Sequence, residues 1–386
     1  MDSAIASRFP LICRAKPLGL PLSERIAALI ESAIDPAGAD LHDQVARASG
    51  VINVASLIAS DAGMRDLAWD MCWRHYNIYA AAKHFEPGTA TMAMQPMVNI
   101  PRLLIRDGQG ELAHEALTGL YRAAQRKGRA EIGGRVIDVA AVIRTPEDHR
   151  AVCSDLWMTL LSDGTRALAQ AGRWTQAAEA VARNKGVGDR LWDGRQVTVL
   201  SLLERGRFAE AAATVESSVI GDASEKAVAA TLAAFCAKEA RNASIVRLNT
   251  ALGEALALIE LDEPPTIMFR TQLALTALAL GDAVGGTHRM TPRIRSGIIE
   301  AASTDAYAAR AVIASLGPDA QCLQRVVDAG GLGAGTMPPD LMTQMMTGVA
   351  EAETRLAMLV GAPAILPHME GPGRCVRSSD SGRFEA

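Results

Sequence analysis

Apolar residues recur every three or four positions through most of the chain, which is the pattern of amphipathic α-helices. In the segment 41–62, for example, this spacing is followed by Val45, Ala48, Ile52, Ala55 and Ile58. With breaks at glycine, proline and polar clusters, the pattern predicts helices at 23–34, 41–62, 67–84, 89–105, 111–126, 145–168, 174–183, 191–205, 208–219, 224–239, 245–260, 267–281, 295–316, 321–329 and 340–359. We therefore expect an all-α fold.

One short segment, residues 129–137, carries a β pattern. Two β-prone pieces flank Gly133 and Gly134, a pair that suits a two-residue hairpin turn. Because an isolated hairpin is only marginally stable, we expect it to pack on neighbouring helices.

The pattern divides the chain into five regions. Residues 1–21 carry three prolines and no helical period, and are expected to form an irregular arm. Residues 22–128 form N-terminal helical hairpins, 129–144 a short hairpin and linker, and 145–361 a region of helical repeats. Residues 362–386 are rich in Pro, Gly, Ser and Arg and are expected to be disordered.

A heptapeptide repeat gives the most specific signal. The segment GRWTQAA at 172–178 recurs as GRFAEAA at 206–212, an offset of 34 residues. Glycine suits the left-handed end of a helix, the aromatic residue fills the gap between two helices, and the alanines let the second helix approach. This region resembles tetratricopeptide repeats (TPRs) over about two repeats, residues 158–219.

The resemblance has departures, and an alternative stays open. Leu161 and Arg195 stand where a TPR has a large aromatic residue, and no proline closes either repeat. An irregular α-solenoid of antiparallel helical hairpins is the alternative, and both arrangements bury a continuous core between stacked pairs. The resemblance implies a concave groove that binds an extended peptide or a helix of a partner, lined by Thr159, Ser162, Arg166, Gln170, Asp193 and Gln196. Ordinary solvated positions are the competing interpretation of these residues.

A second candidate site lies in one aromatic-rich helix. Trp69, Trp73 and Tyr76 fall at i, i+4 and i+7, and Tyr79 continues the same side. A ligand pocket is one interpretation, with Arg74 binding an anion and His75 or Tyr76 moving a proton. Pro96 and Pro101, expected to kink or divide a neighbouring helix, would open such a pocket. A core stripe that fills a gap between helices is the favoured interpretation.

Composition and charge argue against several classes of protein. A formal charge of −4 and a pI near 6.0 show no basic footprint for nucleic acid. The best apolar run, residues 267–280, is interrupted by Arg270 and Gln272, so no membrane span is expected. Six cysteines without C-x-x-C spacing favour a reducing cytoplasm. Arginine outnumbers lysine 33 to six, a bias associated with GC-rich bacterial genomes.

Motifs for metals, cofactors and catalysis are absent from the sequence. The seven histidines form no H-E-x-x-H pair, and no G-x-S-x-G elbow occurs. The glycine-rich segment 330–336 lacks the lysine of a nucleotide-binding loop, and we expect a flexible linker. We expect no metal and no cofactor.

Two hypotheses follow. The first is a cytoplasmic scaffold or regulatory module that binds a partner peptide or protein in its groove and is a candidate for homo-oligomerisation. The second is a small-molecule-binding protein or enzyme with a pocket around residues 73–79. We favour the first, and whether the chain catalyses any reaction stays open with a preference for none.

Overall fold

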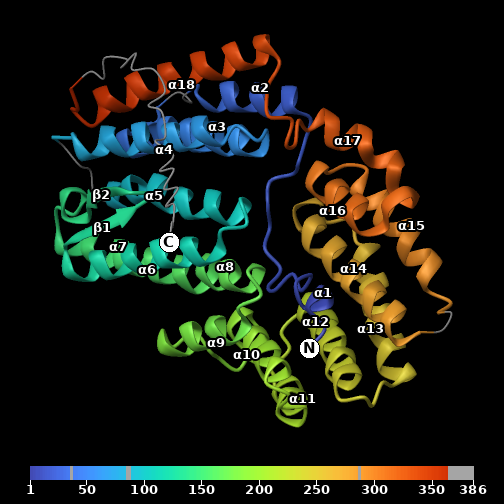
Figure 1. Ribbon diagram of the computed structural model, residues 1–386. Helices are drawn as coiled ribbons and strands as arrows, with labels where there is room; N and C mark the ends of the chain where they lie inside the picture. The colour runs from blue at the N-terminus through green and yellow to red at the C-terminus, as the bar shows by residue number, and fades with distance from the viewer. Residues whose placement is uncertain (35–37, 84–87, 286–287, 364–386) are drawn as a thin grey trace, which may run out of the picture.

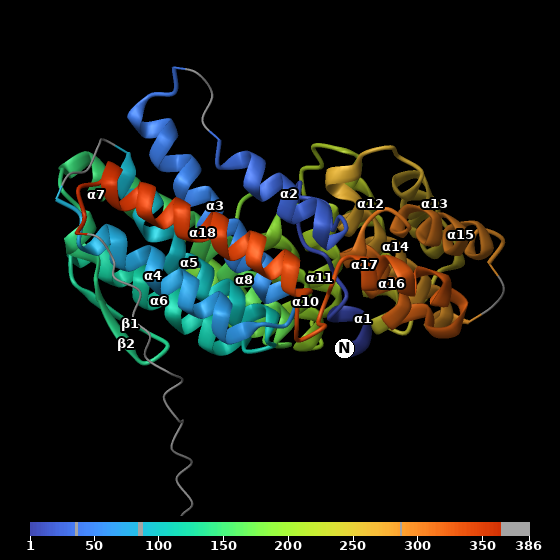
Figure 2. The same ribbon diagram turned by 90° about the horizontal axis from the view of Figure 1, so that it is seen from above.

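The computed structural model describes residues 1–34, 38–83, 88–285 and 288–363. Within them the chain is mostly helical, with one antiparallel two-stranded hairpin, as the sequence predicts. Apart from residues 362 and 363, the tail expected to be disordered lies outside the described part. The helices form two halves that face each other, with the first residues of the chain between them (Figures 1 and 2).

The N-terminal half is a layered stack of paired helices. Each helix packs on the next one along the chain, from α2 through α6, because each carries an apolar stripe to bury. This half contains α2 (Leu22–Ser32), α3 (Leu41–Asp61), α4 (Arg65–Ala80), α5 (Thr89–Arg106), α6 (Gly110–Arg126), β1 (Arg129–Ile132), β2 (Arg135–Asp138), the 3₁₀ turn η1 (Val139–Val142) and α7 (Pro146–Thr159).

The C-terminal half continues the succession of pairs. A π-helical turn, η2 (Leu160–Gly164), leads from α7 into it. Its other elements are α8 (Thr165–Gln170), α9 (Trp174–Arg183), α10 (Asp193–Glu204), α11 (Phe208–Glu216), α12 (Ala223–Glu239), α13 (Ile245–Ile259), η3 (Pro264–Thr266), α14 (Ile267–Val284), α15 (Thr291–Ala302), α16 (Ala306–Leu316), η4 (Gly317–Leu323) and α17 (Gln324–Ala329).

The two ends of the described chain are exchanged between the halves. The last helix, α18 (Pro339–Leu359), leaves the C-terminal half and packs on α2 and α3. Conversely, the arm contains a short helix, α1 (Ser3–Ala6), and its Ile5, Phe9 and Leu11 are buried in the C-terminal core. Each half therefore completes its core with a segment from the other end, a grouping that the predicted domain boundaries do not include.

The glycine-rich segment before α18 is bound to the N-terminal half. The backbone N–H of Gly333 donates to the carbonyl of Asp61 at 2.7 Å, and that of Gly335 donates to the carbonyl of Ala62 at 2.7 Å. These bonds satisfy carbonyls at the C-terminal end of α3. Instead of the flexible linker that the sequence suggested, this segment is a hydrogen-bonded junction between the halves.

The repeated heptapeptide forms two equivalent turns between packed helices. Gly172 and Gly206 both have positive φ, +71° and +73°, and end the first helix of a pair. Trp174, Ala177 and Ala211 are all buried in the core that these packed helices share. The motif therefore marks packed helix pairs, as predicted.

The two prolines of α5 do not interrupt it. Pro96 and Pro101 are both buried within α5, which runs undivided, so the predicted division does not occur.

The segment Pro264–Val284 is, within the described residues, the one helix long and apolar enough to cross a membrane. Of its apolar window, 67% is buried inside the protein, as in a core helix.

Candidate functional site

The chain's own N-terminal arm runs between the two halves (Figure 1), and we call the surface of the helices that it contacts the groove. After α1, residues 7–21 run in an irregular, mostly extended path from the C-terminal half to the start of α2. Along this path the arm contacts side chains and backbone of α8, α10, α14 and α16. Segments far apart in sequence thus build one site.

Both backbone groups of Ile12 are bound by charged side chains. The N–H of Ile12 donates to Asp193 Oδ1 at 2.6 Å, and its carbonyl accepts from Arg166 Nη2 at 3.0 Å. Asp193 is the first residue of α10, and Arg166 lies in α8. Because the contacts are made to the main chain, they recognise an extended backbone rather than a particular side chain.

Asp193 also binds the next cation along the arm. Arg14 Nη2 donates to Asp193 Oδ2 at 3.0 Å, and Arg166 Nε lies 3.8 Å from the same oxygen. Burial raises the pKa of the Asp193 carboxyl, an effect that the two arginines oppose. Burial likewise lowers the pKa of Arg166, and the Asp193 charge opposes the shift. A single buried carboxylate therefore links the arm, α8 and α10.

Further contacts hold the arm on either side of Ile12. Thr276 Oγ1 donates to the carbonyl of Arg8 at 3.0 Å, and the N–H of Lys16 donates to the carbonyl of Pro265 at 2.9 Å. Leu11, between them, is buried with φ +60°, a left-handed conformation that leucine rarely adopts. Such a conformation persists only where the surrounding contacts fix it.

Near its end the arm packs closely against the first residues of α16. Gly19 N–H donates to Asp305 Oδ2 at 2.7 Å, and the N–H of Ala306 donates to the carbonyl of Gly19 at 2.9 Å. The other oxygen of Asp305 caps α16 by accepting from the N–H of Ala308 at 2.7 Å. One buried carboxylate thus caps a helix and holds the arm.

The structure separates the six predicted groove residues into two sets. Arg166 and Asp193 bind the arm, and Gln170 lines a cavity beside it. Gln196 is instead buried, and its Nε2 donates to the carbonyl of Leu191 at 2.8 Å. Thr159 and Ser162 bond to each other at the π-helical turn, where Ser162 Oγ donates to the Thr159 carbonyl. Three of the six residues therefore lie together in the groove.

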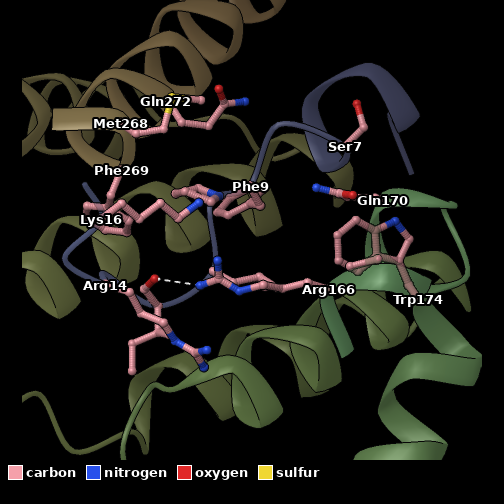
Figure 3. Close-up of a pocket in the computed structure, with 14 residues that line it drawn as sticks. Ser7, Phe9, Arg14, Lys16, Arg166, Gln170, Trp174, Met268, Phe269 and Gln272 are labelled. Carbon is pink, nitrogen blue, oxygen red and sulfur yellow. Dashed lines mark hydrogen bonds between the residues drawn. The ribbon is translucent and has the colours of Figure 1, made fainter. Parts of the chain in front are cut away.

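A cavity of about 230 Å³ lies between the arm and the helices behind it (Figure 3). Lys16 reaches into it from the arm and Arg166 from α8. The remaining lining residues include aromatic rings, a methionine and two amides: Phe9, Trp174, Met268, Phe269, Gln170 and Gln272. The cavity thus combines positive charge with apolar walls.

The charge balance of this cavity is positive. Arg14, Lys16 and Arg166 line it, and no carboxylate is found among the described lining residues. Loss of hydration lowers the pKa of Lys16, the neighbouring charges of Arg166, Arg106 and Arg14 lower it further, and the carboxylate of Asp163 opposes these shifts. An anion in the cavity would relieve this repulsion.

The β-hairpin packs on the aromatic helix α4. Trp73 lies under the guanidinium of Arg135 at 5.0 Å, and Tyr76 Oη donates to the carbonyl of Asp138 at 3.3 Å. Trp73 and Tyr76 meet edge to face, with ring centroids 6.4 Å apart. Trp69 lies against the hairpin turn, where a side-chain carbon at Gly133 would overlap its ring. The stripe thus joins the hairpin to the helices.

The polar residues of this helix have structural surroundings. Arg74 Nε lies 3.1 Å from Glu353 of α18 and 3.3 Å from Asp70. Tyr79 Oη and Ser49 Oγ share a buried hydrogen bond of 2.5 Å. His75 is fully buried, and complete desolvation lowers its pKa to about 3, which keeps the ring neutral. None of these residues lines the cavity beside the arm, and their role as a ligand pocket stays a prediction.

Metal ligands do not gather in the described residues, where no group of three or more His, Cys, Asp and Glu side chains could hold an ion.

The sequence analysis did not identify Phe9, Lys16 and Gln272 as residues that line the cavity. The apolar run Phe9–Ile12 in the arm was the available signal, because an exposed arm has no reason to carry it.

Comparison with known proteins gives no family. The chain matches no protein-family model, no curated protein and no solved structure. The resemblance to tetratricopeptide repeats therefore rests on the repeated heptapeptide, to which the structure adds packed helix pairs.

Proposed function

We propose that this chain is a protein-interaction module whose groove binds extended peptides, and that the arm occupies the groove as an intramolecular ligand. The binding of both backbone groups of Ile12 by Arg166 and Asp193 carries the proposal. Extended segments of other proteins present the same N–H and C=O groups, so a partner would compete with the arm for the same contacts.

The same contacts suggest how two copies would associate. If the arm of one copy entered the groove of another, the identical hydrogen bonds would form between chains, as in domain swapping. The proposed oligomer is therefore an arm-exchanged dimer. In this view the helix pairs form a TPR-like solenoid around the peptide, and the protein works in the reducing cytoplasm, consistent with free Cys13, Cys72, Cys153, Cys236 and Cys322 in the described part.

A peptide-binding experiment tests the proposal. Ile12→Pro removes the N–H that Asp193 accepts, and proline also disfavours the left-handed conformation of Leu11 before it. The arm should leave the groove while the groove residues stay intact. We expect a fluorescent peptide of residues 7–21 to bind the Ile12→Pro protein saturably, and the wild type far more weakly.

Two controls decide the result. Adding Asp193→Ala to Ile12→Pro should abolish peptide binding, and a peptide of scrambled sequence that contains d-proline at every third position should not bind. Arg14→Glu, which places a second carboxylate beside Asp193, is a milder way to release the arm if Ile12→Pro disturbs folding. If both variants keep the wild-type circular dichroism and neither binds the peptide, the groove is not a peptide site.

A further inference from the structure

We propose that the cavity beside the arm binds a small organic anion. Its phosphate or carboxylate group lies between Lys16 and Arg166, and its apolar part lies against Phe9 and Trp174. The ligand thereby bridges the arm and the C-terminal half.

Unused hydrogen-bond donors support the anion. No ion pair or hydrogen bond of the Lys16 ammonium occurs among those of the described residues, although it projects into the groove. Arg166 donates one N–H to the Ile12 carbonyl, but its buried Nε has no acceptor within hydrogen-bond distance in the described part of the chain. The burial argument applies to Arg166 Nε, whose nearest carboxylate oxygen, Asp193 Oδ2, is 3.8 Å away, because a buried donor without a hydrogen-bond acceptor loses its hydration without full compensation. Lys16 is an exposed residue, so its ammonium is an accessible cation at the mouth of the cavity.

The excess of positive charge supports the same ligand. Three cations line the cavity, and Asp193, the carboxylate that contacts two of them, already binds the Ile12 N–H. Charge-assisted hydrogen bonds from lysine and arginine to an oxyanion are among the strongest in proteins. An anion would therefore gain more here than a neutral molecule of the same shape.

The apolar lining and the small volume of the cavity restrict the part of the ligand that carries no charge. Trp174 and Phe269 are buried and present apolar surface to the cavity, with Met268 beside them. A volume of about 230 Å³ is below the usual range of pockets for drug-sized molecules. The ligand is therefore a small molecule with one apolar or aromatic group, such as an aryl phosphate or an aryl carboxylate.

This site does not depend on the proposed peptide binding. The anion contacts the docked arm, so the site requires only that the arm is docked and does not require that a partner can displace it. Failure of the peptide experiment would leave the cavity unchanged, and failure of anion binding would leave the backbone contacts of Ile12 unchanged.

Isothermal titration of the full chain tests the proposal with four probes: phenyl phosphate, benzoate, inorganic phosphate and phenol. We expect saturable binding of phenyl phosphate or benzoate, and the preference between them identifies the anionic group. Inorganic phosphate should bind more weakly because it lacks the apolar part. Lys16→Gln should weaken binding about tenfold or more, since it removes a charged donor.

Matched variants separate the site from general electrostatics. Gln170→Glu adds a negative charge to the lining with almost no change of shape and should also weaken binding. Lys83→Gln removes an exposed lysine outside the cavity and should leave binding unchanged. The proposal is overturned if no anion binds, if phenol binds as well as phenyl phosphate, or if Lys16→Gln binds like the wild type while its circular dichroism is unchanged.

Discussion

The hydroxyl of Tyr307 donates a hydrogen bond to the carboxylate of Asp61, which joins α16 of the C-terminal half to the last residue of α3. The same buried carboxylate accepts from Arg25 at 2.5 Å and from Arg106 at 2.6 Å. Burial and the Asp61 charge raise the pKa of Tyr307, which keeps its hydroxyl protonated as the donor. Arg25 also lies over the Tyr307 ring, 5.7 Å from its centroid.

Removing this charge should destabilise the whole protein. Asp61→Asn leaves Arg25 and Arg106 without their buried partner, and breaking such a pair costs about 3 kcal/mol. We expect the free energy of unfolding in urea to fall by about that amount. Asp70→Asn is the control: its carboxylate is mostly exposed beside Arg74, so its loss should cost less than about 1 kcal/mol. Equal effects of the two substitutions would show that Asp61 has no special role.

The passage of the arm over α16 leaves no space for a side chain at Gly19. A Cβ there would lie 2.8 Å from Tyr307 Cδ2 and 2.9 Å from the Ala306 nitrogen. Gly19→Ala should therefore shift the arm toward a released state, at a cost of about 1 to 3 kcal/mol. We expect trypsin to cleave after Arg14 about tenfold faster, because cleavage follows the population of the open state.

The matched control for this prediction is Gly50→Ala. Gly50 lies in α3, and a Cβ there has no neighbour within 4 Å. Its cleavage rate after Arg14 should equal that of the wild type. Identical rates for Gly19→Ala and the wild type would mean that the arm does not need this close passage.

Local patterns predicted the elements of this fold, but long-range contacts decide the site. The hairpin and the Gly172 and Gly206 turns follow from a few neighbouring residues, and the structure contains them. The contact of Ile12 with Asp193 joins positions 181 apart in sequence, and no local pattern reports it. The apolar residues of the arm indicated burial without indicating a partner.

Helix register explains why the predicted groove residues do not all lie together. The TPR pattern placed Asp193 and Gln196 in one lining, three positions apart. In the structure Asp193 begins α10 and points to the arm, while Gln196 is buried and bonds to the loop before the helix. Because α10 begins at Asp193, the side chain of Gln196 is turned inward, and a family pattern without a known start for this helix does not show that.

The buried His75 should make stability depend on pH. Its ordinary pKa is 6.5, and burial lowers it to about 3 in the folded protein. Between these values the unfolded chain binds a proton that the folded chain excludes. Stability is therefore fully present above pH 6.5 and falls as the pH decreases, by up to about 1.4 kcal/mol per pH unit from this residue.

Substitution isolates this contribution. His75→Phe should make the decrease between pH 6.5 and pH 5 shallower by about one proton, measured by urea unfolding at several pH values. Met94→Leu, buried in the same core without a titratable group, should keep the wild-type dependence. The prediction is wrong if His75→Phe and the wild type lose stability in parallel as the pH decreases.

The hairpin turn offers a test that separates backbone strain from packing. Gly133 and Gly134 both have positive φ, +56° and +77°, so alanine at either position strains the backbone. A Cβ at Gly133 would also overlap the Trp69 ring, whereas one at Gly134 has no neighbour within 4 Å. We therefore expect Gly133→Ala to lower the free energy of unfolding by about 1 to 3 kcal/mol more than Gly134→Ala.

Asparagine at the same position tells the two causes apart. Asn is favoured at the first central position of this turn, so turn chemistry alone predicts that Gly133→Asn is nearly neutral. Contact with Trp69 predicts that it remains destabilising, because the added side chain still meets the ring. Urea unfolding of Gly133→Asn, Gly133→Ala and Gly134→Ala distinguishes these outcomes. A neutral Gly133→Asn would mean that α4 does not hold the hairpin through Trp69, and that Tyr76 and Trp73 fix its position instead.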